Sequence, residues 1–283
     1  MEMQVAPVRG GRDRTALDVW TIAYAGFASL VIAWRGGGLA APLVIAHAAL
    51  VGVALLAPSL RRSNVAGRFL AAFYPLMAVL GLYSAIGLVN AAAGTSHDAA
   101  VQAWEAALFG AQPSRDWIRG RPDAALSWTL HVAYLSYYMT LAAAPLGLWL
   151  SGRREGARHV AFLMMLTFYL CYAVFLVFPV AGPRYVFPQA DNAATAVLPA
   201  RLAQRLLDGN AAWGTAFPSS HVAVSLVAAA AALREWAAFG LGLLVLAVLL
   251  TLGTVYGQFH YACDAMAGSV LASVVLAASR KAP

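Results

Sequence analysis

The chain has 283 residues, of which 61% are hydrophobic and 11% are charged, and its mean hydropathy is +0.70. Soluble domains average about 45–50% apolar and about 25% charged residues, so this composition excludes a water-soluble fold. The net charge of +7 comes from arginines in the polar segments between apolar stretches, a pattern typical of membrane proteins. The sequence therefore predicts one all-α, polytopic domain whose partner is the lipid bilayer, and no nucleic acid.

Apolar stretches long enough to form membrane spans recur along the whole chain. A bilayer core of about 30 Å needs about 20 apolar residues per helix, and lipid leaves no backbone group unpaired, so each stretch must be helical. We expect about eight transmembrane helices. The stretches cover residues 19–34, 38–57, 69–90, 126–150, 159–180, 217–233, 236–256 and 259–279.

The arginines predict the orientation of these spans. If the N-terminus is cytoplasmic, most of the arginines fall in segments on the cytoplasmic side, as the positive-inside rule requires. We therefore expect both termini in the cytoplasm, an uncleaved first span and a location in the cell inner membrane.

Two segments on the outer side have helical periodicity. In residues 99–109, Val101, Trp104 and Leu108 recur at helical spacing, and in residues 198–208 a leucine recurs every four residues. We interpret both as amphipathic surface helices that pack on the bundle, with a lid over a lipid site as the alternative.

Two polar clusters begin predicted spans on this outer side. The last span begins near His260 and Asp264, which are four residues apart and therefore predicted to share a helix face. A carboxylate that accepts from one imidazole nitrogen leaves the other nitrogen as a nucleophile or base. The alternative is a purely structural His–Asp hydrogen bond.

The second cluster is Phe-Pro-Ser-Ser-His, residues 217–221. Pro218 suits a first helical turn, and Ser219 or Ser220 can cap it, which would leave free N–H groups beside His221 to attract an anion. A helix dipole contributes only about 0.3–1 kcal/mol, too little to hold a phosphate, so a cation is needed. Arg184, which follows a Gly-Pro pair after the fifth span, can supply it.

These clusters together resemble the type 2 phosphatidic acid phosphatase superfamily over residues 168–268. The resemblance implies a six-helix core, here residues 69–283, preceded by a tail and two extra helices in residues 1–68. It also implies a metal-free and cofactor-free reaction through a phosphohistidine on His260, with Asp264 orienting that ring and His221 as general acid and base. The phosphate would be bound by Arg184, Ser219 and Ser220.

The chain departs from the superfamily motifs at several positions. Val177 replaces a lysine, Tyr185 a proline, Ser220 a glycine, and Gly253-Thr254 a Ser-Arg pair. The absence of two cations should cripple binding of a dianionic phosphomonoester, unless Arg201, Arg205 or another group substitutes for them, whereas binding of a singly charged phosphodiester should suffer less.

This variant is most similar to the branch of fungal inositol phosphorylceramide synthase and its bacterial relatives. The similarity rests on Tyr261 after the histidine, on the second motif and on residues 105–117. It implies a lipid phosphate or phosphodiester donor, with water or an alcohol such as inositol as acceptor.

Four tyrosines are candidates for the substrate cavity, and three other functions remain open. The tyrosines are Tyr134, Tyr138, Tyr185 and Tyr261. The alternatives are a metalloenzyme that binds a metal through His221, His260 and Asp264, a lipid transporter or flippase, and an inactive structural relative. The sequence leaves the oligomeric state open.

Overall fold

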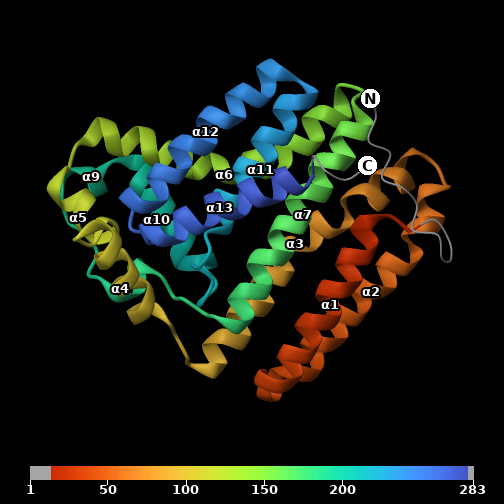
Figure 1. Cartoon of the computed structure of the whole chain (residues 1–283), viewed down its shortest axis with the longest axis horizontal. Helices are drawn as coiled ribbons and strands as arrows, with labels where there is room; N and C mark the ends of the chain where they lie inside the picture. Colours follow the sequence, from red (N-terminus) through yellow and green to blue (C-terminus); the bar gives the residue numbers. More distant parts are fainter. Residues whose placement is uncertain (1–13, 280–283) are drawn as a thin grey trace.

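The computed structural model describes residues 14–279, which form an all-α bundle without a β-strand (Figure 1). Each of the eight predicted stretches coincides with a long helix, so the predicted fold class is confirmed. These helices are α1 (Ala16–Arg35), α2 (Ala40–Arg61), α3 (Val65–Ala93), α6 (Ala124–Leu150), α7 (Arg154–Val177), α11 (Ser220–Glu235), α12 (Ala237–Tyr256) and α13 (Ala262–Ala278).

Shorter helices gather at one end of the bundle, on the left of Figure 1. They are α4 (Asp98–Phe109), α5 (Pro113–Gly120), α8 (Pro183–Val186), α9 (Ala193–Ala196) and α10 (Leu198–Asn210). The two predicted surface helices correspond to α4 and α10. On α4, however, Glu105 is fully buried while Trp104 and Leu108 are exposed, so the acidic side faces the protein.

Five of the helices are long and apolar enough to cross a membrane: α1, α2, α3, α7 and α12. The chain is therefore a multi-pass membrane protein. Helices α11 and α13 are shorter, with 16 and 17 residues. Their helical rise gives lengths of about 24–26 Å, less than a bilayer core of about 30 Å.

The shortness of α11 and α13 corrects two predicted boundaries. Pro218 lies before α11 rather than in its first turn, and α13 begins at Ala262 rather than at Phe259. The N–H groups of Phe259 and His260 donate to the carbonyl of Thr254, at 2.9 and 3.0 Å, and so close the end of α12 instead of starting a new helix. His260 therefore lies in a loop, and not on a helix face with Asp264.

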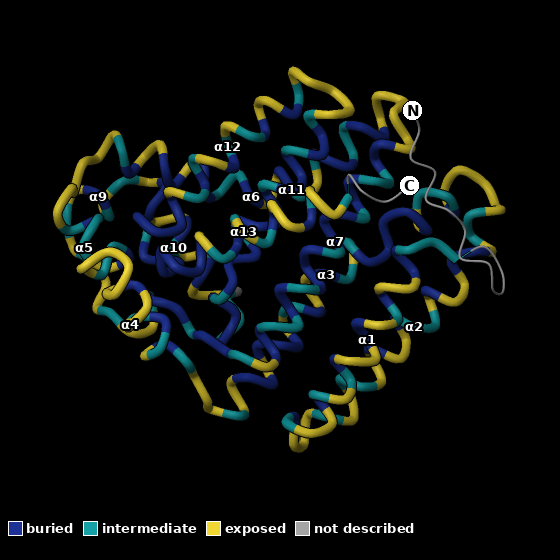
Figure 2. Tube along the Cα trace, viewed as in Figure 1, coloured by how far each residue is buried: buried dark blue, intermediate teal, exposed yellow. Residues whose placement is uncertain are grey.

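Helix α11 is the centre of the bundle and packs against α6, α7, α12 and α13. Figure 2 shows α7 and α11 largely buried, whereas α1 and α2 expose much of their surface. A glycine lets α13 approach α11 closely: a Cβ at Gly268 of α13 would lie 2.6 Å from the carbonyl oxygen of Ser219. This contact brings the beginnings of α11 and α13 together.

The two N-terminal helices pack on α3 and α7. Asp18 of α1 is fully buried and forms an ion pair with Arg61 at the end of α2, with Nη2 2.5 Å from Oδ2. Its other oxygen accepts a hydrogen bond from the hydroxyl of Tyr74 on α3, at 3.2 Å. This network joins the three helices at one end of the bundle.

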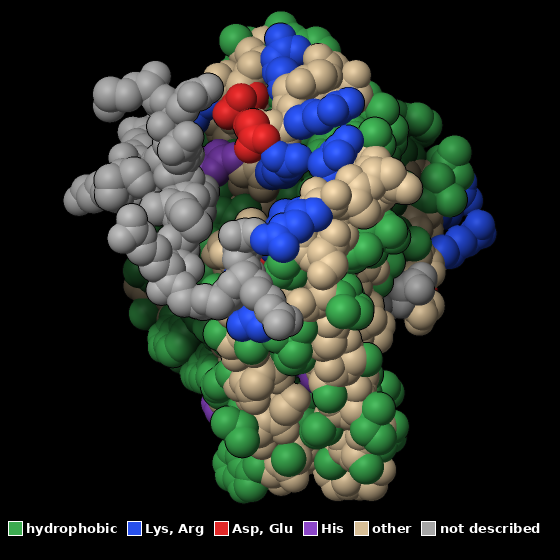
Figure 3. Space-filling view, turned by 90° about the vertical axis from the view of Figure 1, so that its right-hand side faces the viewer, with side chains coloured by type: hydrophobic (Ala, Val, Ile, Leu, Met, Phe, Trp, Pro, Cys, Tyr) green, Lys and Arg blue, Asp and Glu red, His purple; other side chains and the backbone are tan. Residues whose placement is uncertain are grey.

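Arginines are concentrated at the same end. Arg61 ends α2, Arg154 begins α7, and Arg234 lies in the last turn of α11. Figure 3 shows Lys and Arg side chains gathered toward one end of the face it draws, above a largely uncharged surface. The basic N-terminal tail before Arg14, and Arg280 with Lys281, lie outside the described residues.

Candidate active site

Two imidazole rings meet where α11 and α13 begin. His221 lies in the first turn of α11, and His260 lies in the loop between α12 and α13. The Nδ1 atom of His221 is 3.4 Å from the Nε2 atom of His260, and the ring centroids are 5.4 Å apart. Two histidines that are 39 residues apart in sequence thus form one cluster.

The Nδ1 atom of His260 has two oxygen neighbours on the side of the ring away from His221. Nδ1 is 3.0 Å from the carbonyl oxygen of Ala216 and 3.4 Å from Oδ2 of Asp264. A carbonyl can only accept, so Nδ1 carries a proton and Nε2, which faces His221, is left with a lone pair. A nucleophilic imidazole needs this arrangement.

Asp264 is completely buried at the start of α13. Its Oδ2 atom accepts the N–H of Tyr261 at 2.8 Å, and its Oδ1 atom has no hydrogen-bond partner among the described residues. The sequence placed His260 and Asp264 on one helix face. The structure instead brings them together through a turn, in which Tyr261 is the N-cap of α13.

The start of α11 supplies the predicted N–H groups. Ser219 is the N-cap, and its hydroxyl oxygen accepts the N–H of Val222 at 3.3 Å. The N–H of Ser219 itself donates to the carbonyl of Asp264 at 3.0 Å. Ser219 and Ser220 are both buried directly before His221. The first turn of α11 is therefore fixed to the first turn of α13.

The loop that carries Arg184 packs against both of these motifs. The N–H of Ala216 donates to the carbonyl of Val180 at 2.8 Å. Gly182 has a left-handed φ of +102°, and a Cβ there would lie 3.2 Å from the Cβ of Ala216 and 3.4 Å from the carbonyl oxygen of Phe259. Glycine is needed for this conformation and this proximity.

Among the described residues, the guanidinium of Arg184 has a hydrogen-bond partner for only one of its two terminal nitrogens. Nη2 is 2.6 Å from Oδ1 of Asp208 on α10, whereas Nη1 is buried and has no partner among the described residues. The aromatic side of the cluster comes from α6, which carries Tyr134. The ring of Tyr134 stacks on His221 with a centroid distance of 5.5 Å.

The four predicted cavity tyrosines fall into different places. Tyr134 contacts His221 as described, whereas Tyr138 and Tyr185 are exposed. Tyr261 is buried, and its hydroxyl donates to Asp98 at 2.9 Å. The sequence analysis did not select Tyr137, whose ring is closer to His221, at 4.2 Å. Tyr137 and Tyr138 are neighbours in the sequence, and their spacing from Tyr134 does not show which of them faces His221.

Two buried carboxylates on α4 were also missed. Asp98 accepts the N–H groups of Ala181 and Gly182, each at 2.8 Å, and so fixes the loop that carries Arg184. Glu105 accepts the N–H of Ala262, also at 2.8 Å, at the first residue of α13. In the sequence, Asp98 and Glu105 are marked only as acidic residues between the apolar positions of α4.

The two positions where the superfamily has cations carry uncharged side chains in this chain. Val177, at the end of α7, is 57% exposed on the outside of the bundle. Thr254 is buried, and its hydroxyl donates to the carbonyl of Thr251 at 2.7 Å. Neither side chain supplies a positive charge for a phosphate.

Within residues 14–279, no group of three or more His, Cys, Asp or Glu side chains is arranged to hold a metal ion. The geometry is instead that of two imidazoles, a buried carboxylate, a helix N-terminus and a guanidinium. This set can bind and transfer a phosphoryl group.

The sequence profile of the PAP2 superfamily matches residues 99–278, which include all of these groups. The chain belongs to the PAP2 superfamily. No curated protein and no solved structure matches the chain. Membership in the PAP2 superfamily, the type 2 phosphatidic acid phosphatases, supports phosphatase or phosphotransferase activity on lipid phosphates in the membrane.

Proposed function

We propose that this PAP2-superfamily protein transfers the phosphoryl group of a membrane lipid to water or an alcohol through a phosphohistidine on His260. The observation that carries the proposal is the geometry of His260. Its Nδ1 is held by Ala216 and Asp264, and its Nε2 faces His221. A base in this tautomer is ready to attack phosphorus.

The two halves of the reaction use the same pair of rings. In the first, Nε2 of His260 bonds to phosphorus, the bond from phosphorus to the leaving oxygen breaks, and His221 gives that oxygen a proton. In the second, His221 takes a proton from the acceptor hydroxyl, whose oxygen displaces His260. An attacking atom needs about 3–3.5 Å to phosphorus, so the rings must separate when phosphate binds between them.

The phosphate oxygens would be held by three kinds of donor. Arg184 can turn its unused Nη1 toward the phosphate, the first turn of α11 offers backbone N–H groups, and Ser219 and Ser220 lie beside them. A single donor of this kind contributes about 2.7–4 kcal/mol to the transition state. Asp264 would stabilise His260 while it carries the phosphoryl group.

The donor that this site favours is a phosphodiester with one negative charge. Of the three motif positions at which the superfamily has a cation, only Arg184 keeps one here, because Val177 replaces the lysine and Thr254 replaces the second arginine. This composition supports the branch of inositol phosphorylceramide synthase, with inositol as one acceptor.

We also propose the orientation and the division of the chain. The arginine-rich end, with Arg61, Arg154 and Arg234, would face the cytoplasm together with both termini. The histidines would then lie at the outer face of the cell inner membrane. Residues 69–283 would form the catalytic core, and residues 1–68 would add the tail and two helices.

The test is to compare wild type with His260→Ala in liposomes that contain a panel of lipid phosphates and phosphodiesters, with and without inositol. Free phosphate and transferred product are measured separately, and acid-labile phosphate on the protein reports phosphohistidine. His159→Ala, at the arginine-rich start of α7, is the matched control. We expect His260→Ala to lose turnover and acid-labile phosphate, and the control to keep both.

Two outcomes would contradict the proposal. Full turnover in His260→Ala would contradict a phosphohistidine on this residue. If neither free phosphate nor transferred product formed from any donor, the proposed enzymatic activity would be contradicted. Loss of activity in a chelator would favour the metalloenzyme instead. Lipid movement that survives in His260→Ala would favour a transporter.

A further inference from the structure

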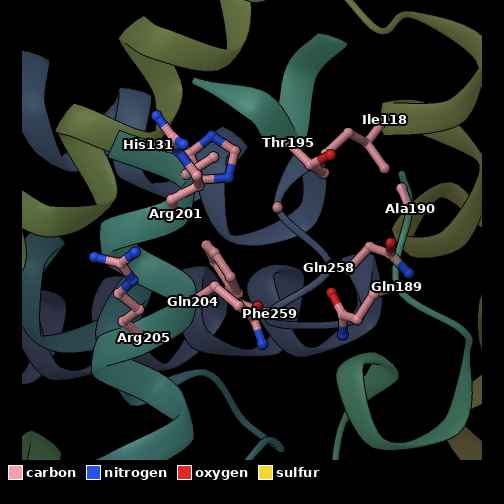
Figure 4. A pocket seen from close by; sticks show the side chains of 12 residues that line it. Ile118, His131, Gln189, Ala190, Thr195, Arg201, Gln204, Arg205, Gln258 and Phe259 are labelled. Atoms are coloured by element: carbon pink, nitrogen blue, oxygen red, sulfur yellow. The ribbon is translucent and has the colours of Figure 1, made fainter. Parts of the chain in front are cut away.

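A cavity of about 260 Å³ lies beside the histidine cluster, between α6, α9, α10 and the loop that joins α12 to α13 (Figure 4). Ligand pockets for drug-sized molecules usually enclose about 300–1,000 Å³. This cavity therefore has room for a small molecule or a lipid headgroup, but not for an acyl chain.

The lining of the cavity is basic on one side and rich in neutral hydrogen-bonding groups on the other. Arg201 and Arg205, one turn apart on α10, contribute two guanidiniums. Figure 4 shows them across the cavity from the amides of Gln189 and Gln258. Within residues 14–279, no Asp or Glu lines the cavity. An anion is attracted here, and the amides can both donate to and accept from hydroxyl groups.

Gln258 gives a second, independent indication of a ligand. Its side chain is 1% exposed and lines the cavity, and its Nε2 atom has no hydrogen-bond partner among the described residues. A buried donor without a partner is unfavourable, and a ligand bound in the cavity would supply the missing acceptor. Gln258 also has a φ of +59°, a left-handed conformation that a residue other than glycine rarely adopts.

The polar face of α10 connects the cavity to the phosphate site. Arg201, Arg205 and Asp208 lie at successive turns on one face, and Asp208 pairs with Arg184. On the other side, Phe259 lines the cavity directly before His260 in the sequence. Its ring packs on Tyr134 with a centroid distance of 4.2 Å, and Tyr134 stacks on His221.

We propose that this cavity binds a small, negatively charged, hydroxyl-rich group, which is either the headgroup of the lipid substrate or a soluble acceptor. Arg201 and Arg205 bind its charge, and Gln258 and Gln189 bind its hydroxyl groups. The role of the cavity in group transfer rests on the proposed function, whereas its ability to bind does not.

The experiment measures binding in the full-length His260→Ala protein, so that turnover does not interfere. In nanodiscs of phosphatidylcholine, calorimetry compares inositol 1-phosphate, inositol and inorganic phosphate as soluble probes. In a second arm, the thermal midpoint is compared between nanodiscs with phosphatidylinositol and nanodiscs with phosphatidylcholine alone. A response to the soluble probe without a response to phosphatidylinositol identifies an acceptor site, and a response to phosphatidylinositol, with or without one to the soluble probe, identifies a headgroup site.

Two sets of variants locate the binding. Arg201→Gln with Arg205→Gln removes two exposed positive charges at the cavity, and Arg154→Gln with Arg158→Gln removes two at the opposite end of the bundle. We expect the first pair to weaken binding of the responding probe at least tenfold and the second pair to leave it within twofold. Gln258→Asn, which shortens the amide, should reduce the preference for inositol 1-phosphate over inorganic phosphate.

Three results would overturn the inference. They are the absence of a response to any probe in both arms, equal effects of the two arginine pairs, and inorganic phosphate binding as tightly as inositol 1-phosphate. Failure of the proposed function is distinguishable, because it appears as full turnover in His260→Ala while binding in the cavity persists.

Discussion

The guanidinium of Arg184 is paired with the carboxylate of Asp208, with Nη2 2.6 Å from Oδ1. The two ends of this pair differ in their surroundings, because the side chain of Arg184 is 10% exposed and that of Asp208 is 59% exposed. The buried cation is therefore held by a carboxylate that can move away into solvent. A phosphate that binds the unused Nη1 therefore competes with Asp208 for the positive charge of Arg184, although not for the same nitrogen.

The first prediction follows from this competition. Asp208→Asn should lower the KM for the lipid donor roughly two- to fivefold, since an ion pair whose carboxylate is exposed to solvent contributes only about 0–1 kcal/mol. The value of kcat should change little. Steady-state kinetics in liposomes measure both, and Asp191→Asn, another exposed acid, is the control. A higher KM in Asp208→Asn would show instead that Asp208 holds Arg184 in its working position.

The second prediction concerns Arg184 itself. Arg184→Gln keeps a polar side chain but removes the charge, and we expect kcat/KM to fall about 10²- to 10³-fold, the usual effect of losing one transition-state donor. Arg184→Lys should recover part of the activity, because it restores the charge but not the forked geometry. Equal activity of Gln and Lys variants would mean that charge at this position is unimportant.

The third prediction tests a carboxylate that the sequence analysis missed. Asp98→Ala leaves the N–H groups of Ala181 and Gly182 without acceptors, and buried unpaired groups cost about 1–3 kcal/mol each. The loop should then lose its fixed position, so both the thermal midpoint and the affinity for the donor should fall.

Tyr261→Phe is the matched comparison for Asp98. It removes one hydrogen bond to the same carboxylate and leaves both loop N–H groups paired. We expect it to keep most of the activity. If Tyr261→Phe were as damaging as Asp98→Ala, the phenol rather than the loop would be the group that matters.

The difference between Asp98 and the histidines shows what sequence could reveal. His221, His260 and Asp264 lie in short motifs whose spacing is visible in the chain. The loop N–H groups that Asp98 accepts lie 83 and 84 residues further along the chain, and the N–H at the start of α13 that Glu105 accepts lies 157 residues further along. Helical periodicity assigns a residue to a face of its own helix, but it does not show which distant backbone covers that face.

The helix starts were missed for a related reason. Residues 217–219 and 259–261 each begin with a phenylalanine and contain no Asp, Glu, Lys or Arg, so no charge separates them from the apolar helices that follow and hydropathy extends each span too far. Their backbones instead bond to Asp264 and Thr254, which are tertiary or turn contacts. The spans themselves were predictable, because a bilayer requires continuous apolar segments.

The last prediction tests the proximity of α11 and α13. A Cβ at Gly268 would lie 2.6 Å from the carbonyl oxygen of Ser219, a backbone atom that cannot turn aside. Gly268→Ala should therefore push the two helices apart and destabilise the protein by about 1–3 kcal/mol, as overpacking does.

In Gly268→Ala, turnover should fall even at temperatures where the variant is still folded, because Ser219 and Asp264 lie directly beside the two histidines. Gly242→Ala on α12 is the control, since its Cβ would meet no atom within 4 Å. Thermal unfolding and turnover in the same liposomes measure the two effects. Full activity in Gly268→Ala would mean that the histidines tolerate a wider separation of their helices than the proposed mechanism allows.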